Sequence, residues 1–228
     1  MNVVVFAPHP DDDILGCGGS LALLTRAGHD VAVVYVTSGE AGGPPGAEAD
    51  LGLRREGEAR AAARVLGVGQ TIFLRKPDGY VTCDRESLKE TTTLIRRLRP
   101  DRIYIPHRND AHRDHRATSE LVLEAAGRAA GPWFPDCPGE PWRVGTILAY
   151  EVWTPLARIA CVEDISPALD LKRRAMAEHA SQLANLAYDE AFCGLNRYRG
   201  VMTGRGRYCE CFDIETTDAF SLDNQPVP

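Results

Sequence analysis

A histidine, a proline and three successive aspartates, His9 to Asp13, directly follow an apolar run that is typical of a buried strand. Adjacent carboxylates repel one another, so a chain places three together on a solvated face, at the start of a helix, or around a cation. His9 and Asp12 are three residues apart across a turn, so both side chains can reach one ion. Asp11 points in a different direction, toward water bound at that ion.

A second cluster of the same side-chain types lies between Asn109 and His115, after a later apolar run. In a parallel α/β sheet the functional groups gather beyond the carboxyl ends of the strands, so the two clusters can converge. Catalytic zinc sites typically combine three His, Asp or Glu ligands with an open position for water. His9, Asp12 and His115 would supply these ligands. Zinc is the expected ion, although two histidines and a carboxylate also suit ferrous iron.

Each cluster also has a purely structural explanation. Asp11 to Asp13 could cap the following helix, where carboxylates favour the positive end of the helix dipole. His112 and His115 could be solvated residues near another helix start. Neither explanation accounts for both clusters following strands at the same edge of a sheet.

The elements that must position these residues alternate along the chain. Alternating strands and helices predict a Rossmann-like, mostly parallel α/β sheet with helices on both faces. We expect one domain over residues 1–215, with residues 131–142 as a surface excursion and residues 216–228 as a polar tail. The predicted strands are 3–7, 31–36, 71–74, 102–105 and 146–152, and the predicted helices are 16–28, 54–66, 87–98, 115–130 and 166–185.

Composition narrows the functional class. A net charge of -6 disfavours a general nucleic-acid binder, which needs a basic surface to neutralise phosphates. No apolar run is long enough to span a membrane, and the N-terminus lacks the pattern of a signal peptide. The 7 cysteines are odd in number and scattered, unlike a secreted disulfide framework, so we expect most of them to be reduced and structural. These features together predict a cytoplasmic protein.

The two clusters resemble the signatures of the LmbE/PIG-L family of zinc-dependent N-deacetylases. The first signature corresponds to Ala7 to Asp12, with Pro8 inserted and with Asp13 where glutamate is commoner. The second, His-x-Asp-His, corresponds to His112 to His115. Further family-like segments extend the resemblance over residues 3–212: Thr37 to Glu40, Arg55 with Glu58, Pro77 to Gly79, Tyr150 with Glu151, and His179 to Gln182.

The resemblance implies amide hydrolysis on N-acetylglucosamine conjugates, with acetate and a free amino sugar as products. Glu40, Arg55 and Asp78 match family positions that line the substrate pocket. Arg55 could instead face water on a charged helix, and Asp78 could serve its Pro-Asp-Gly turn alone. The implied catalytic roles are zinc ligands at His9, Asp12 and His115, a general base at Asp11, and an oxyanion-stabilising His112 oriented by Asp114.

Other patterns fit less well. The glycines from Gly16 to Gly19 fail the dinucleotide-binding spacing, because Leu21 stands where a third glycine is needed, so we interpret them as close helix packing. Cys209 and Cys211 lack the second pair of a structural zinc site. The lone His29 and His107 are interpreted as structural.

Two alternatives to the deacetylase remain at this point. A thiol-conjugate amidase, cleaving a larger amide on a glucosamine-containing thiol, would share every catalytic residue. A catalytically silent sugar-binding protein would keep the fold. The expected partner is in each case a small amino-sugar molecule, with no nucleic acid or membrane, and a homo-oligomer is compatible with the sequence.

Overall fold

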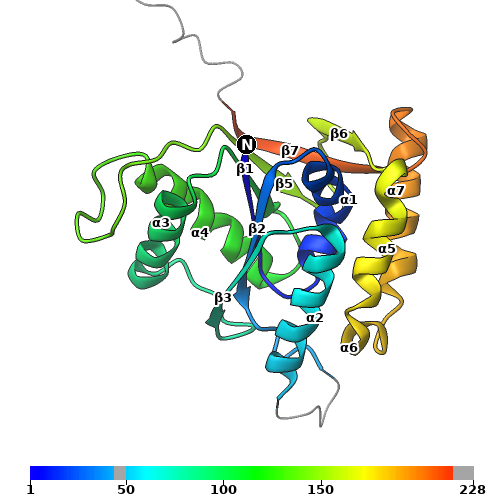
Figure 1. Cartoon of the computed structure of the whole chain (residues 1–228), viewed down its shortest axis with the longest axis horizontal. Coiled ribbons are helices and arrows are strands. Elements are labelled where there is room, and N and C mark those ends of the chain that lie inside the picture. The colour runs from blue at the N-terminus through cyan, green and yellow to red at the C-terminus, as the bar shows by residue number, and fades with distance from the viewer. Residues whose placement is uncertain (44–49, 218–228) are drawn as a thin grey trace, which may run out of the picture.

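Five parallel strands form the centre of the molecule, in the spatial order β3-β2-β1-β4-β5 (Figure 1). The apolar sequences of β1, β2, β4 and β5 bury side chains on both faces, as expected for a parallel sheet covered by helices, whereas the edge strand β3 is half-buried. We describe residues 1–43 and 50–217 of the chain from a computed structural model. The strands predicted from sequence correspond to β1 (Asn2–Ala7), β2 (Asp30–Thr37), β3 (Gln70–Lys76), β4 (Arg102–Pro106) and β5 (Thr146–Tyr150).

Two further strands extend the sheet beyond β5. β7 (Cys209–Thr217) pairs antiparallel with β5, and β6 (Cys161–Asp164) pairs antiparallel with β7. Neither strand was predicted, and β7 includes the first two residues of the expected polar tail. Residues 218–228 of that tail lie outside the described residues. All 7 cysteines are free thiols, including Cys209 and Cys211 on β7.

Helices cover both faces of the sheet, which confirms the predicted α/β architecture (Figure 1). On one face α3 (Arg85–Leu98) packs beside α4 (Arg113–Ala129). On the other, α1 (Asp12–Arg26), α2 (Leu51–Leu66) and α5 (Leu169–Ala177) contact one another. Each face has its own buried apolar cluster, so the sheet separates two cores.

The helices differ from the prediction most clearly in three places. α1 begins at Asp12 rather than at residue 16, so the aspartates of the first cluster belong to the helix start. The helix predicted for residues 166–185 is instead a 3-10 turn η1 (Ser166–Ala168), α5, and a short α6 (Ala180–Leu183). The longer α7 (Tyr188–Thr203), which ends at Gly204 with φ of 65°, was not predicted.

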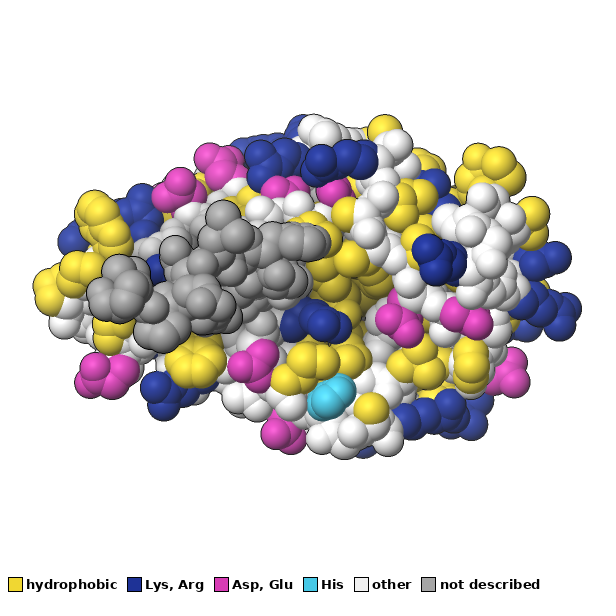
Figure 2. Space-filling model, turned by 90° about the horizontal axis from the view of Figure 1, so that it is seen from above, with side chains coloured by type: hydrophobic (Ala, Val, Ile, Leu, Met, Phe, Trp, Pro, Cys, Tyr) yellow, Lys and Arg dark blue, Asp and Glu magenta, His cyan; other side chains and the backbone are white. Residues whose placement is uncertain are grey.

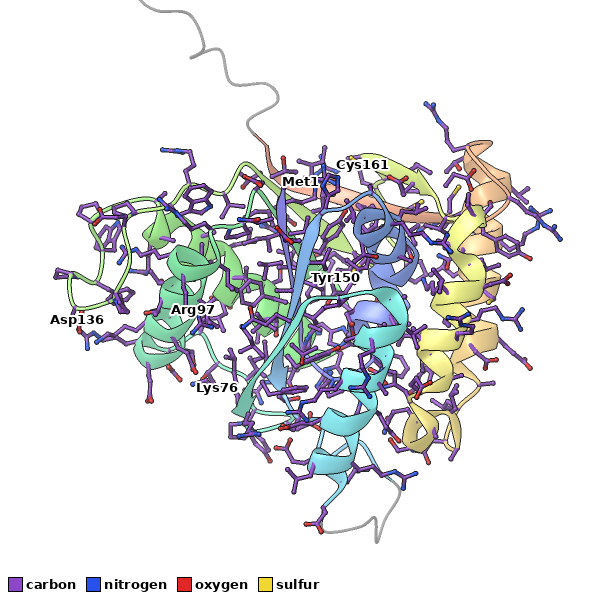
Figure 3. The ribbon with its side chains drawn as sticks, viewed as in Figure 1. Met1, Lys76, Arg97, Asp136, Tyr150 and Cys161 are labelled. Carbon is purple, nitrogen blue, oxygen red and sulfur yellow. The ribbon has the colours of Figure 1, made fainter. Side chains whose placement is uncertain are left out.

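The excursion at residues 131–142 is organised by one buried arginine. Arg96 of α3 is 5% exposed, and its guanidinium donates to the carbonyl oxygens of Gly131 and Trp133 at 3.0 and 2.6 Å. Asp136, at the outer end of the excursion, contacts Lys89 (Figure 3). The segment thus packs against α3 of the same domain.

The surface at the amino ends of the parallel strands carries interspersed acidic and basic side chains (Figure 2). Within residues 1–43 and 50–217, no helix combines the length and the apolar character needed to cross a bilayer.

Helix α1 lies unusually close to the sheet and to η1. A Cβ at Gly16 would meet the ring of Tyr150 at 2.2 Å, and one at Gly19 would meet Ile165 at 2.7 Å. Tyr150 lies in the middle of the molecule, and its hydroxyl donates to the Phe6 carbonyl at 3.0 Å (Figure 3). The glycines therefore serve close packing, as the sequence indicated.

A buried ion pair also holds the backbone of α1 in place. Lys172 of α5 and Glu210 of β7 are 0% and 1% exposed, with 2.7 Å between Nζ and Oε1. Lys172 also donates to the Leu15 carbonyl, and Glu210 accepts from the backbone N–H groups of Gly19 and Ser20. Both charges are thus fully hydrogen-bonded, the condition under which a buried pair is tolerated.

We expect Lys172→Met to lower the free energy of unfolding by about 3–5 kcal/mol, because the Glu210 charge would remain buried without its partner. The matched control is Arg158→Met, which breaks the 2.9 Å pair with Asp213 where the arginine side chain is 77% exposed. That change should cost less than about 1 kcal/mol. Urea unfolding of the two variants measures both values, and equal losses would contradict the structural role of Lys172.

Candidate metal centre and catalytic cavity

The two clusters meet because β1 and β4 are neighbours in the sheet. Val3 to Val5 pair in parallel with Arg102 to Tyr104, so the loops after these strands leave the same edge side by side. The rings of His9 and His112 lie 4.8 Å apart, and those of His9 and His115 lie 5.4 Å apart. The predicted convergence is thus what the structure shows.

The three successive aspartates separate in space because they lie at a helix start. Asp12 Oδ2 lies 3.0 Å from His9 Nδ1 and 3.2 Å from His115 Nε2. Asp11 contacts Arg55, with 3.2 Å between Oδ2 and Nη2. Asp13 turns the opposite way, into the core, and accepts from the Tyr35 hydroxyl at 3.0 Å.

Asp11 has a strained backbone. Its φ of 115° lies in the region that side-chain-bearing residues rarely occupy, and strain of this kind concentrates at functional sites. Asp11 is the N-cap residue of α1, yet its side chain makes no capping hydrogen bond. Its carboxylate faces a cavity instead, so helix capping does not explain this residue.

The environment of His115 fits a metal ligand. The side chain is fully buried, and neither ring nitrogen has a hydrogen bond of acceptable geometry within the described part of the chain. Asp12 Oδ2 and Asp110 Oδ1 nevertheless lie 3.2 and 3.3 Å from Nε2 and Nδ1. A metal-binding histidine characteristically places its second nitrogen against a carboxylate, the position that Asp110 occupies here.

His9 has carboxylates on both sides of its ring. Its Nε2 lies 3.0 Å from Asp78 Oδ1 and 3.4 Å from Asp114 Oδ2. Among the described residues, two groups have ligand atoms within 4.8 Å of one another: His9, His112 and His115, and His9, Asp78 and Asp114. The predicted set with Asp12 is not one of them. The predicted ligand set of His9, Asp12 and His115 is distinguished by the single oxygen that both rings face.

The electrostatics of the centre favour a cation. Burial lowers the pKa of His115, but Asp12 and Asp110 outweigh this effect and raise the pKa to about 9. Burial alone would raise the pKa of Asp12, yet His115 and His9 bring that pKa well below its usual range. Negative charge thus holds extra protons on the two histidines, and a divalent cation could take their place.

The other two aspartates carry less charge. Burial raises the pKa of Asp11 to about 7, although the Arg55 guanidinium opposes the shift. Burial likewise raises the pKa of Asp13 to about 7. The three adjacent carboxyl groups are therefore not all fully ionised at neutral pH, which reduces their mutual repulsion.

His112 has a defined tautomer when neutral. Its Nδ1 accepts from the Asp114 backbone N–H at 3.2 Å, so the proton of the neutral ring is on Nε2. Burial and the neighbouring His9 and His115 lower the pKa of His112, which favours the neutral ring. The Asp114 carboxylate, expected to orient His112, instead accepts from the Gly79 backbone N–H at 2.6 Å and faces His9.

A cavity of about 250 Å³ opens onto Asp11, Asp12, His9 and His112. Of the predicted substrate-binding residues, Arg55 and Asp78 line it. Arg55 is 3% exposed and also donates to the carbonyls of Pro10 and Gly39, so it does not merely face water. Glu40 is exposed beside a neighbouring hollow, where its Oε1 accepts from the Asp78 backbone N–H.

Sequence reasoning assigned no role to several residues of the site. Asp110 carried a signal, since it lies within the second cluster and five positions before His115. It accepts from the backbone N–H groups of Trp153 and Thr154 as well as facing His115. Trp153 and Tyr188, which line the cavity, had no recognisable signal, because each is a single aromatic residue in a segment without a motif.

Comparisons with known proteins agree with these motifs. Residues 4–126 match the family described as PIG-L, GlcNAc-PI de-N-acetylase. The diacetylchitobiose deacetylase of Thermococcus kodakarensis is 32% identical over 220 residues, covering 91% of this chain and 80% of that protein. A Rhodococcus jostii protein named 1D-myo-inositol 2-acetamido-2-deoxy-alpha-D-glucopyranoside deacetylase is 30% identical, covering 77% of this chain and 79% of that protein. The crystal structure of a conserved protein from Thermus thermophilus superposes with a TM-score of 0.86 at 32% identity, over 99% of this chain and 100% of that one.

We expect Asp110→Asn to weaken divalent-metal binding by about 10- to 100-fold, because His115 would lose the carboxylate that orients it. Competition against a chelator measures the affinity. Asp136→Asn, which changes an exposed carboxylate on the surface excursion, is the matched control and should bind metal normally. A folded Asp110→Asn protein with unchanged affinity would exclude this role.

Proposed function

The chain belongs to the PIG-L family of de-N-acetylases, and from that premise we propose that it is a metal-dependent hydrolase that removes the N-acetyl group from an amino sugar of the N-acetylglucosamine type. The observation that carries the proposal is the position of Asp12 Oδ2, which lies 3.0 Å from His9 Nδ1 and 3.2 Å from His115 Nε2. Asp12 lines a cavity that Asp11 also lines.

His9, Asp12 and His115 are the proposed ligands of the metal. Two nitrogens and one carboxylate oxygen suit zinc, and also ferrous iron. When bound, the ion supplies positive charge that polarises the amide carbonyl and eases the deprotonation of water.

Asp11 is the proposed general base. Its carboxylate lines the cavity, and Arg55 holds it in place by a contact of 3.2 Å. Asp11 takes the proton of the attacking water and then returns it to the departing amine nitrogen. A group that performs both steps must lie between the water and the nitrogen, so the sugar is bound on the Asp11 side of the cavity.

His112 is the proposed donor to the developing oxyanion. Its Nδ1 is occupied by the Asp114 backbone N–H, which leaves Nε2–H to donate. We propose Arg55 and Glu40 as contacts of the sugar hydroxyl groups. Asp78, also predicted to bind substrate, is in contact with His9 at 3.0 Å and with the Ala41 backbone N–H, so we assign it the positioning of His9.

Asp11→Asn should keep the metal, because the proposed ligands are unchanged, while kcat falls by about 100- to 10,000-fold through loss of the base. His115→Ala is the contrasting variant and should lose both metal and activity. Metal content and acetate release, measured on the same preparations, check both outcomes. Loss of metal from Asp11→Asn would make Asp11 a ligand, and a fully metal-loaded His115→Ala protein would overturn the proposed centre.

The activity itself is tested with protein stripped of metal and then restored with zinc or ferrous iron. We expect acetate and free amine to be released from N-acetylglucosamine or its conjugates only after restoration. Release of a larger acyl product instead would identify a thiol-conjugate amidase. A metal-loaded protein that binds the sugar but releases no acyl group would be the silent sugar-binding protein.

A further inference from the structure

A second cavity adjoins the catalytic one and differs from it in chemistry. Its volume is about 310 Å³, and it shares Leu15, Trp153 and Tyr188 with the catalytic cavity. Its remaining walls are mostly apolar side chains of α7 and the segment before it, including Phe192 and Leu195. The polar catalytic cavity and the apolar pocket thus meet at the side chains of Leu15, Trp153 and Tyr188.

The charged residue in this apolar pocket is not available to a ligand. Glu151 lines the pocket, but its Oε1 accepts from Arg199 at 3.0 Å. Its Oε2 accepts from Arg199 at 2.6 Å and from the Leu156 backbone N–H at 2.7 Å. An occupant would therefore be held by apolar contact rather than by charge.

Two large apolar side chains at the pocket are exposed to solvent. Trp153 is 49% exposed and Leu186 is 53% exposed. The Trp153 ring meets the Tyr188 ring edge-on at 6.0 Å, and its backbone N–H donates to Asp110 Oδ2 at 3.0 Å. The Trp153 backbone is thus anchored to the carboxylate that faces His115, while the Trp153 side chain remains accessible to solvent and to a ligand.

The pocket is much larger than an acetyl group needs. Its volume is at the lower end of the range of small-molecule sites, about 300–1,000 Å³, whereas an acetyl group has only two carbon atoms. The pocket also lies mostly outside residues 4–126, the part of the chain that matches the family. It is therefore a feature that the shared catalytic motifs do not require.

The proton transfer assigned to Asp11 determines which end of the substrate lies near the pocket. Because Asp11 must return a proton to the amine, the sugar lies on the Asp11 side. Leu15 follows one turn later in α1, with its N–H on the Asp11 carbonyl at 2.9 Å. Tyr188 lines the same catalytic cavity as Asp11. The passage into the apolar pocket thus begins beside the sugar.

We propose that this apolar pocket binds an alkyl or aryl aglycone carried by the amino sugar. The assignment rests on the proposed deacetylase function and specifies its substrate class. The sugar would occupy the polar cavity between Arg55 and His112, and its aglycone would pass between Leu15 and Tyr188 to lie against Phe192.

The test compares two series of substrates with the metal-restored enzyme. In the first, the methyl, propyl, butyl and phenyl glycosides of N-acetylglucosamine vary the aglycone. In the second, N-acetyl-, N-butanoyl- and N-hexanoylglucosamine vary the acyl group. We expect kcat/KM to rise about two- to fourfold per methylene of the aglycone, and not with the acyl chain. A flat aglycone series, or a rise with acyl length, would overturn the proposal.

Two variants of α7 locate the effect. Ala191→Trp places a large side chain in the pocket and should abolish the preference for butyl over methyl glycoside. Val201→Trp adds the same side chain at a position on the same helix that is 57% exposed, and should keep the preference. A preference that survives Ala191→Trp unchanged would exclude this pocket.

A binding measurement separates failure of this proposal from failure of the proposed function. Calorimetry with the metal-loaded Asp11→Asn protein compares the affinities for methyl and butyl glycosides without turnover. Tighter binding of the butyl glycoside supports the pocket even if no acetate is released by the wild type. Equal affinities, with normal acetate release by the wild type, would exclude the aglycone pocket and still support the deacetylase function.

Discussion

Four carboxylates are buried around two histidine rings, and the surrounding loops are built to hold them. Buried charge is costly unless it is paired and hydrogen-bonded, and here most of the donors are backbone N–H groups. Asp114 binds the loop after β3 through Gly79, and Asp110 binds the segment after β5 through Trp153 and Thr154. The carboxylates thus connect loops that follow different strands. The conformation of these loops and the geometry of the centre therefore depend on each other. The four residues are Asp12, Asp78, Asp110 and Asp114.

The same constraint explains why α1 is so firmly fixed. Asp11 and Asp12 lie at its start, so a small shift of the helix would move both the proposed base and a proposed ligand. Gly16 lets the helix approach Tyr150 of the sheet, while Lys172 of α5 and Glu210 of β7 bind its backbone. A buried ion pair far from the chemistry therefore acts on the chemistry through the position of one helix. Its cost in desolvation is offset by hydrogen bonds that define where α1 lies.

Sequence alone predicted the parallel strands and the convergence of the two clusters, because both follow from strong local rules. Buried parallel strands require continuous apolar runs, and the ends of such strands meet at one edge of the sheet. It failed at β6 and β7, which are short or mix charged with apolar residues, and at α7, although Tyr188, Ala191, Phe192 and Leu195 follow a helical spacing. It also failed at the start of α1, where Asp12 and Asp13 look like loop residues but form the first helical turn. The contact of the Asp114 carboxylate with His9 was also beyond prediction. It depends on how the loop after β3 folds over the centre, and no spacing in the sequence encodes that arrangement.

The features that could be predicted from sequence belong to the proposed catalytic centre, whereas the features that could not be predicted belong mainly to the apolar pocket. Proton transfer and metal binding require particular side chains at particular spacings, so they leave motifs, and these lie within residues 4–126. An apolar pocket requires only that its walls be apolar and correctly placed, a condition that many sequences satisfy and that leaves no motif. In this chain those walls come mainly from Val152 to Leu195, the region in which the predicted elements failed most often. The proposed catalytic centre and the proposed aglycone pocket are therefore built largely from different parts of the chain, and their cavities share Leu15, Trp153 and Tyr188. In this arrangement the walls of the pocket can change without a change in the proposed metal ligands and base.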